Sequence, residues 1–523
     1  MPGGGMYAFV TYGSQNVLLS ANPDMTYFYK VFRKYTHYAE ESFSVSFDGP
    51  NELKWDQSIQ IRAKLPRYTD LIRDMYFVFT LPDIYSKYVD SRQPHQYNFA
   101  WAEYIGCHII QSAAIYIGGS KIQEFDGTYI VSKANVDMTN TQFEKFKELV
   151  GQVPEMYDPA NGQYTGGRSS ANVQGSYPTV YRNPTVTSQL NRPSIMGRDL
   201  YVPLPFWFSQ DPSLALPLCA LQLQEVQLQI VLRPIRDLYT ISDPSGYPVA
   251  PGYRMNASAS AYQNNVPTYI PDPTYDVSNN NFYINNFLTD IDFALPPKNE
   301  LPYNPRLYCT YVYLTDEERV VFATNELKYL IYQNNWYNFP AEFKRNFLQL
   351  EIHNPITRLL IVPRRSDSIA YRNAAYNYTN WVNPRRPPFV ATPGLVPPAS
   401  NYATSGLLVP QGQKEIVREL RVICDGNELQ DTRPGDYFSR VVSYKYYEGC
   451  NDVQVVPYPF SLKYSPIQPS GSINASRIKT FEVDLYPYQL PANTPYVYDI
   501  TVYIESINWV VIASGTGDLK YAV

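Results

Sequence analysis

Apolar and polar residues alternate with a period of two in several short stretches of the first half of the chain. Phe43, Val45 and Phe47, for example, are separated by serines, which is the pattern of a strand that buries one face. Gly118 and Gly119 separate two such stretches and predict a hairpin turn. The predicted strands cover residues 42–47, 58–65, 75–81, 114–117, 121–125, 201–208 and 221–232, the last with a bulge at the irregular step Glu225–Val226.

The second half of the chain carries a similar series of strands. Leu348, Leu350 and Ile352 alternate with polar residues, and Asp425-Gly426 provides a turn. The predicted strands cover residues 307–314, 348–353, 356–362, 419–424, 439–446, 460–464, 480–485, 498–504 and 509–513.

Two helices are predicted among the strands. Thr141 and Glu144 form a capping-box pattern, and Gly151 is suited to end the helix that follows. Thr315 and Glu318 repeat the capping pattern before a shorter helix that ends near residue 323.

The domain organisation follows from this order of elements. A β series with an early helix is followed by a linker rich in Pro, Asn and Tyr, and then by a second β series. Two sandwiches of the jelly-roll type satisfy the number of strands and close most sheet edges. We therefore expect an all-β fold with long loops and a few short helices, divided into an N-terminal arm (1–24), a first jelly roll (25–236), a linker or extended loop (237–300) and a second jelly roll (301–523).

The composition agrees with an all-β class and limits the function. The 523 residues include 44 Pro, which interrupts helices, and 49 Tyr, which suits half-buried strands and wide subunit contacts. The formal net charge is −5 without blocks of like charge, so direct binding of nucleic acid is not expected. No stretch of about 18 apolar residues could cross a bilayer, and the residues before Lys30 lack the basic start of a signal peptide.

The residue types of catalytic and metal sites are scattered along the chain. The four histidines have no HxH or HExxH spacing, and the five cysteines form no CxxC pair. We expect no catalytic residue, no metal and no cofactor, with free thiols typical of a reduced site of synthesis. His37 and His108 are interpreted as packed histidines, and the sequons at Asn256 and Asn377, both in long loops, are candidate N-glycosylation sites.

Six segments resemble the major capsid proteins of the nucleocytoplasmic large DNA viruses, a family that includes the iridoviruses and phycodnaviruses. The best match is LYVPLPFWFSQDPSLALPLCALQLQEVQLQIVLRP, at residues 200–234. The other five follow the order of the family along nearly the whole chain, at residues 12–43, 101–130, 311–323, 468–478 and 507–523.

This resemblance implies two consecutive eight-stranded jelly rolls and a structural, non-enzymatic role in the virion. It also implies a homotrimer, and three copies of a two-sandwich chain give the six similar sides of a pseudo-hexagonal capsomer in an icosahedral shell. The expected partners are the chain itself and minor capsid proteins, and the expected site of synthesis and assembly is the infected host cell, in its cytoplasm. Met6, Tyr7, Phe9 and Val10 make the arm apolar, so we expect it to lie beneath the capsomer against minor capsid proteins or an internal membrane.

Two other functions remain as alternatives at this point. A carbohydrate-binding sandwich on the virion surface, such as a spike or lectin, would use aromatic loop residues, for which Tyr376, Tyr378 and Trp381 are the candidates. A jelly-roll enzyme of the cupin type would need His and carboxylate ligands clustered on strands, and this chain lacks that pattern.

Overall fold

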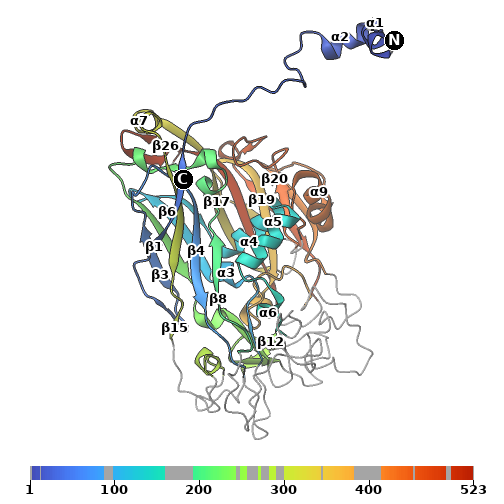
Figure 1. The fold of residues 1–523 in the computed structure, drawn as a ribbon. Coiled ribbons are helices and arrows are strands. Elements are labelled where there is room, and N and C mark those ends of the chain that lie inside the picture. Colours follow the sequence, from blue (N-terminus) through green and yellow to red (C-terminus); the bar gives the residue numbers. More distant parts are fainter. Residues whose placement is uncertain are drawn as a thin grey trace.

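The fold consists of two packed β-sandwiches and an N-terminal arm that extends away from them (Figure 1). It is seen in a computed structural model that describes residues 3–11, 13–86, 98–159, 193–242, 248–255, 269–271, 282–289, 300–342, 346–381, 414–451, 454–490 and 496–521.

The first sandwich has two antiparallel sheets whose inner faces share one core. In β3 (Ile59–Lys64) every second residue is buried and those between are exposed, as one-sided burial of a strand requires. One sheet has the order β1 (Ala39–Ser46), β16 (Arg306–Tyr313), β4 (Leu71–Leu81) and β8 (Arg198–Pro203), with β9 (Leu216–Pro217) also on β4; the other has the order β3, β10 (Val226–Leu232), β6 (Ile110–Ile117) and β7 (Ser120–Phe125).

The second sandwich repeats this arrangement with longer central strands. One sheet has the order β17 (Leu327–Glu342), β26 (Tyr498–Ala513), β19 (Pro355–Arg365) and β23 (Val456–Pro459), with β24 (Ile473–Asn474) on β19 and β27 (Thr516–Leu519) on β26. The other has the order β18 (Asn346–Leu350), β25 (Phe481–Pro487), β20 (Val417–Cys424) and β21 (Asn427–Glu428), with β22 (Arg433–Pro434) on β20. In β19 all residues from Ile356 to Pro363 are buried, because both faces of this sheet are covered.

Shorter elements connect and cover the two sandwiches. The helices are α1 (Gly4–Val10), α2 (Ser14–Ser20), α3 (Ile105–His108), α4 (Gly127–Asp137), α5 (Asn140–Leu149), α6 (Pro154–Tyr157), α7 (Asp316–Thr324), α8 (Ser366–Ala370) and α9 (Ser443–Tyr446). The expected linker contains small strands of its own: β11 (Tyr239–Ser242) joins β5 (Phe99–Trp101) and β12 (Pro248–Val249), while β13 (Tyr253–Met255) pairs with β14 (Tyr269–Pro271). A further pair, β15 (Glu300–Pro302) with β2 (Glu52–Lys54), flanks the first sandwich.

Both predicted helices are present, but their caps differ from the predictions. The capping box of α5 is formed by Thr139 and Gln142, not by Thr141 and Glu144, because the helix begins two residues earlier. Thr315 precedes α7 as expected, but its side chain makes no capping hydrogen bond.

Most predicted strands are confirmed, but the one predicted at 201–208 ends at Pro203 and is followed by a 3₁₀-helix (Trp207–Ser209), and two whole segments were wrong. Residues 439–446 are helical, within a π-helix (Tyr437–Val442) followed by α9, and residues 460–464 follow β23 without forming a strand. The predicted bulge at Glu225–Val226 is instead the start of β10, whose irregular step against β6 lies at Val231–Leu232.

The strand expected to open the second series completes the first one instead. β16 is hydrogen-bonded between β1 and β4, with Ala39 opposite Tyr313 and Leu307 opposite Phe77. The pairing of its alternating apolar residues with both neighbours buries its inner face in the first core. We therefore propose that the boundary between the jelly rolls falls after residue 313, rather than at residue 301.

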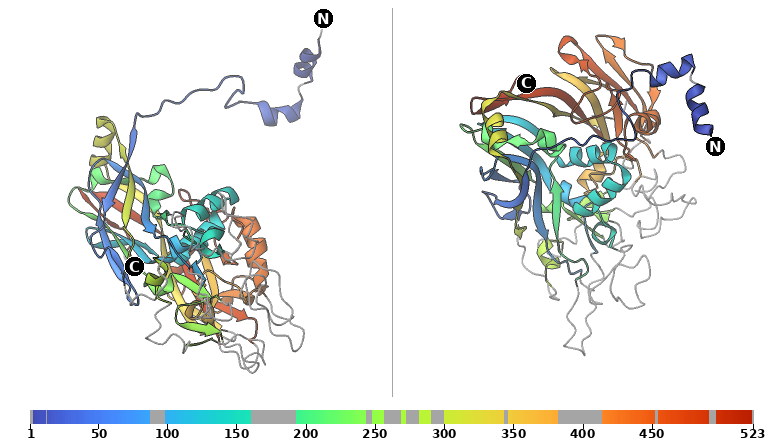
Figure 2. Two further views of the ribbon diagram at one scale, coloured as in Figure 1. Left: turned by 60° about the horizontal axis from the view of Figure 1, so that its bottom comes forward. Right: turned by 45° about the horizontal axis from the view of Figure 1, so that its top comes forward.

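The N-terminal arm is longer than the sequence indicated. Helices α1 and α2 lie well clear of the sandwiches (Figure 2), and residues 21–38 that follow them are exposed. The first strand therefore begins at Ala39 and not near Tyr27. His37 lies in this exposed segment, so its interpretation as a packed histidine was wrong.

Candidate assembly interfaces

The described residues contain no candidate metal site. No three His, Cys, Asp or Glu side chains among them are placed to hold one, and no described helix is long and apolar enough to span a membrane. The five cysteines are free thiols. A buried cluster of four charged side chains lies between the two sandwiches.

This junction cluster consists of Lys133 and Asp137 on α4, Arg358 on β19 and Glu505 on β26. Arg358 Nε and Nη2 donate to the two oxygens of Glu505, each at 2.8 Å, and Nη2 also donates to Asp137 Oδ2 at 2.7 Å. Lys133 Nζ lies 3.2 Å from Asp137 Oδ2 and 3.8 Å from Glu505 Oε1. Because α4 belongs to the first sandwich and the two strands to the second, the ion pairs join the domains.

The groups of the junction cluster keep one another ionised. Arg358 and Glu505 are 1% and 0% exposed; burial alone raises the pKa of Glu505, but the Arg358 guanidinium and Lys133 ammonium more than compensate, so this pKa is held below its ordinary value. The pKa of Asp137 is lowered against the same effect of burial, chiefly by Arg358. All four groups are therefore ionised at neutral pH.

Tyrosine hydroxyls satisfy the remaining hydrogen-bonding positions at this junction. Tyr129 donates to Glu505 Oε1 at 2.6 Å, and Lys133 donates to the Tyr464 hydroxyl at 2.6 Å. The Arg358 guanidinium stacks over the Tyr464 ring, 4.4 Å from its centroid. Tyr503 donates to Asp126, the N-cap residue of α4, at 2.7 Å, so both ends of this helix are bound to the second sandwich.

Backbone contacts also hold the two sandwiches close together. Gly449 N–H donates to the Val136 carbonyl at 2.9 Å, and a Cβ at Gly449 would lie 2.1 Å from the Asn135 carbonyl oxygen. Gln123 and Gln333 extend the contact by donating to the backbone of the opposite sandwich. Only glycine permits the approach at position 449.

The hydrophobic core is also continuous across the junction. The cluster of buried side chains that fills the first sandwich includes residues of the second, among them Ile331, Leu360, Val362 and Tyr503. Alternate residues of β19, such as Leu359 and Ile361, face the separate core of the second sandwich. The sheet of β17, β26, β19 and β23 is therefore shared by both cores.

His108 is packed, as expected, at the end of α3. Its Nε2 lies 2.9 Å from the Asp237 carbonyl oxygen, and its ring contacts Tyr376 edge to face. Burial, with the positive charge of Arg233 as a smaller cause, lowers its pKa to about 3. The imidazole is therefore neutral in the folded protein.

The structure disfavours glycosylation at one of the two candidate sequons. Asn377 is buried, its Nδ2 donates to the Trp381 carbonyl at 2.7 Å, and its Oδ1 accepts from Thr379. A sugar linked to Nδ2 would have to break these contacts. Asn256 lies outside the described residues.

The aromatic residues of the lectin alternative do not form an outward-facing platform. Tyr376 and Tyr378 are 4% and 1% exposed and belong to the core shared by the sandwiches. Trp381 is half-buried. A sugar ring could not stack on these tyrosines without disrupting that core.

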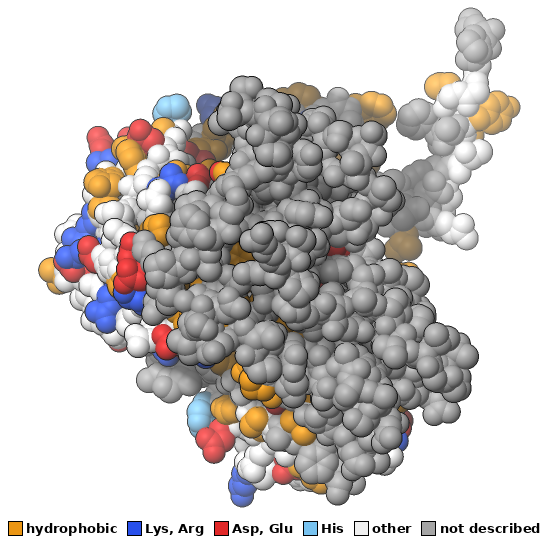
Figure 3. Space-filling view, turned by 90° about the horizontal axis from the view of Figure 1, so that it is seen from below, with side chains coloured by type: hydrophobic (Ala, Val, Ile, Leu, Met, Phe, Trp, Pro, Cys, Tyr) orange, Lys and Arg blue, Asp and Glu red, His pale blue; other side chains and the backbone are white. Residues whose placement is uncertain are grey.

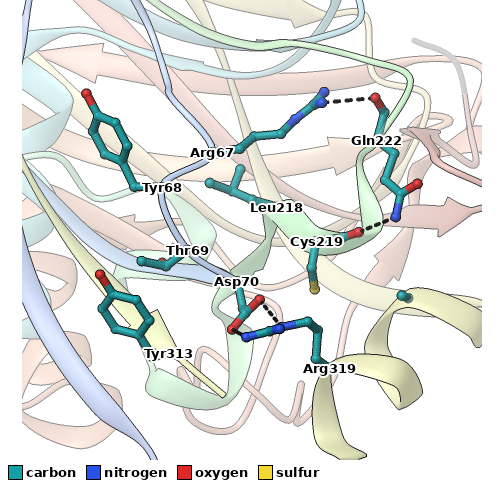
Figure 4. A pocket seen from close by; sticks show the side chains of 10 residues that line it. Arg67, Tyr68, Thr69, Asp70, Leu218, Cys219, Gln222, Tyr313 and Arg319 are labelled. Atoms are coloured by element: carbon teal, nitrogen blue, oxygen red, sulfur yellow. Dashed lines mark hydrogen bonds and ion pairs between the residues drawn. The ribbon is translucent and has the colours of Figure 1, made fainter. Parts of the chain in front are cut away.

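A small pocket opens beside α7 (Figure 4). It has a volume of about 430 Å³, and Tyr68, Asp70, Cys219, Tyr313 and Arg319 are among the residues that line it. Arg319 Nε donates to Asp70 Oδ1 at 2.7 Å across its floor, and burial raises the pKa of the Cys219 thiol to about 11. This thiol is therefore protonated and unsuited to nucleophilic attack.

Charged side chains of both signs are mixed on the described part of one face. The end of the molecule opposite the arm shows Lys and Arg next to Asp and Glu (Figure 3). Such a surface provides no broad basic face for nucleic acid in this view.

The junction cluster could not be recognised from the sequence. Lys133 and Asp137 are an ordinary i, i+4 pair, and α4 lacks a clear apolar period. Arg358 is the only charged residue in the stretch 356–363, and Glu505 is the only one in the stretch 500–513. The last feature was the available signal, since a charge within a buried strand requires a partner.

Comparison with known proteins identifies this architecture. Residues 26–272 match the family described as major capsid protein N-terminus, and residues 318–518 match the large eukaryotic DNA virus major capsid protein. The chain is 24% identical to probable capsid protein 4 of Acanthamoeba polyphaga mimivirus and 23% identical to the major capsid protein of Phaeocystis pouchetii virus, with 99% of each chain covered.

Solved structures show the same fold. A quasi-atomic structure of the PBCV-1 virus capsid superposes with a TM-score of 0.63 at 20% identity, over 95% of this chain and 100% of the other. The Faustovirus major capsid protein superposes with a TM-score of 0.58 at 12% identity, over 97% and 96%. The two sandwiches are thus a double jelly roll, the fold of a class of viral shell proteins and not of enzymes. The chain belongs to the major capsid protein family of the nucleocytoplasmic large DNA viruses.

Replacing Arg358 should destabilise the whole molecule. Arg358→Ala leaves Glu505 and Asp137 as buried charges without their main partner, and we expect the free energy of unfolding to fall by about 3–5 kcal/mol. Chemical denaturation measures this loss. Arg73→Ala is the control, because its pair with Glu40 is partly exposed and should contribute about 0–1 kcal/mol; similar losses in the two variants would contradict a role for the junction cluster.

His108 should make the protein less stable in mild acid. The unfolded histidine takes up a proton below about pH 6.5, whereas the folded one, with a pKa of about 3, does not. As the pH falls from 6 to 4, this histidine should therefore lower the free energy of unfolding by about 1.4 kcal/mol per pH unit. Denaturation across this range should show a smaller slope for His108→Gln, and equal slopes would show that the residue is not buried in its neutral form.

Proposed function

We propose that three copies of this chain form a pseudo-hexagonal capsomer of an icosahedral shell. The supporting observation is the junction: ion pairs, backbone contacts and a continuous core fix the two sandwiches against each other. Two sandwiches held in one orientation act as one rigid block, and three such blocks around an axis present six similar sides. A hinged pair of domains could not present a constant outline to its neighbours.

The proposed location is the virion, after synthesis in the cytoplasm of the infected host cell. Free thiols support synthesis in a reducing compartment. The apolar arm supports a contact beneath the capsomer with minor capsid proteins or an internal membrane, since Met6, Tyr7 and Val10 are each more than 70% exposed.

The purified chain should behave as a trimer. Light scattering coupled to size-exclusion chromatography should give three times the chain mass of 60.0 kDa, about 180 kDa. A monomer at every concentration and salt condition tested would contradict the proposed capsomer.

Deletion of residues 1–24 should separate capsomer formation from shell assembly. None of the described side chains in this segment belongs to either sandwich core, so the trimer should persist. Shell yield, measured by electron microscopy of assembly with the viral partner proteins, should fall. Loss of the trimer itself would contradict an arm that acts only between the capsomer and its partners.

A further inference from the structure

Helix α7 lies on the surface of the first sandwich without being buried by it. None of its nine residues is buried, and Val320 and Val321 are 58% and 53% exposed. Leu223 and Tyr68, on neighbouring loops of the same sandwich, are 75% and 58% exposed. Together with the pocket of Figure 4, we call this surface the α7 platform.

The α7 platform is acidic as well as apolar. Its helix begins with Asp316, Glu317 and Glu318, and only Arg319 within the helix opposes them. Arg319 is already engaged by Asp70 and Asp316. Glu317 is exposed, and the Asp316 side chain is 95% exposed even beside Arg319, so the first turn of α7 presents carboxylates to an incoming cation.

The part of the arm next to β1 has the complementary character. Residues 25–38 (MTYFYKVFRKYTHY) contain three basic residues and no acidic one. All of them are exposed, including Phe28 at 100% and Phe32 at 76%. Large apolar side chains in this number are rarely left in water by an assembled protein.

The arm leaves the body beside the platform. Ala39, the first residue of β1, is paired with Tyr313, and α7 begins three residues after Tyr313. The arm then runs outward (Figures 1 and 2). Phe28 precedes Ala39 by eleven residues, a segment that in extended form spans about 36 Å, which is long enough to reach a neighbouring copy.

We propose that residues 25–38 of one copy dock on the α7 platform of a neighbouring copy in the same oligomer. An aromatic ring occupies the pocket between Tyr68 and Tyr313, and Lys30, Arg33 and Lys34 face the acidic first turn of α7. An anchor ring in a pocket surrounded by opposite charges is the usual composition of a strong contact. The inference rests on the proposed trimer and adds an arm exchange between its copies.

Photo-crosslinking in the purified trimer tests this contact. With p-benzoylphenylalanine in place of Phe32, irradiation should produce covalent dimers of twice the 60.0 kDa chain mass on a denaturing gel. Mass spectrometry should locate the link in residues 316–324 or in the pocket lining. The control carries p-benzoylphenylalanine in place of Leu462, which is 77% exposed on the second sandwich. It should give no link to α7.

The outcomes separate the arm exchange from the trimer. Links confined to one chain, or links between chains that avoid the platform, would overturn the exchange while the trimer stands. A monomeric protein by light scattering would overturn the trimer and with it the exchange.

Charge reversal tests the electrostatic part of the contact. Lys30→Glu, Arg33→Glu and Lys34→Glu together should reduce the yield of linked dimers several-fold, and adding Asp316→Lys with Glu317→Lys should restore it. Lys445→Glu, Lys463→Glu and Arg418→Glu change the net charge equally on the second sandwich and should leave the yield unchanged. Equal loss in both triple variants, or no rescue, would contradict the pairing of these segments.

Discussion

The arrangement of the two jelly rolls depends on the ion pairs of Arg358. Its guanidinium contacts Glu505 in its own sandwich and Asp137 in the other, in a site that excludes water. Burial of these charges is costly, and an apolar cluster of equal volume could be as stable. Hydrogen-bonded ion pairs are directional and apolar contacts are not, because the hydrogen bonds form in one geometry only. The cluster therefore fixes how the sandwiches are oriented, which matters more for a shell subunit than added stability.

The sheet that carries Arg358 and Glu505 serves both cores. One face of β19 and β26 packs on the core of the second sandwich, while the other, including Leu360 and Tyr503, belongs to the core of the first. A rotation between the jelly rolls would expose part of this shared face. The fold thus resists the bending that lateral contacts in a shell would impose, and its arm and platform remain available at one end for contacts between copies.

The sequence allowed most strands to be located, since one-sided burial produces a visible alternation, as in β3. It failed where tertiary contacts replaced that pattern. The strand β17 was missed because polar residues such as Gln333 and Asn334 are buried at the junction, and residues 439–446 were wrongly predicted as a strand because their aromatic and β-branched residues favour one. The sequence did not reveal the junction cluster, because the three elements that carry it are more than 100 residues apart from one another.

By itself, the sequence determined the class of fold, the presence of two β series and the family. Those properties depend on local patterning and on motifs that retain their order along the chain. Only the tertiary structure decided that β16 closes the first sandwich, that Asn377 and Tyr378 are buried, and that α4 is bound to the second sandwich. Each depends on which distant segment covers a given face, and pairing between distant segments leaves no period in the sequence of either one.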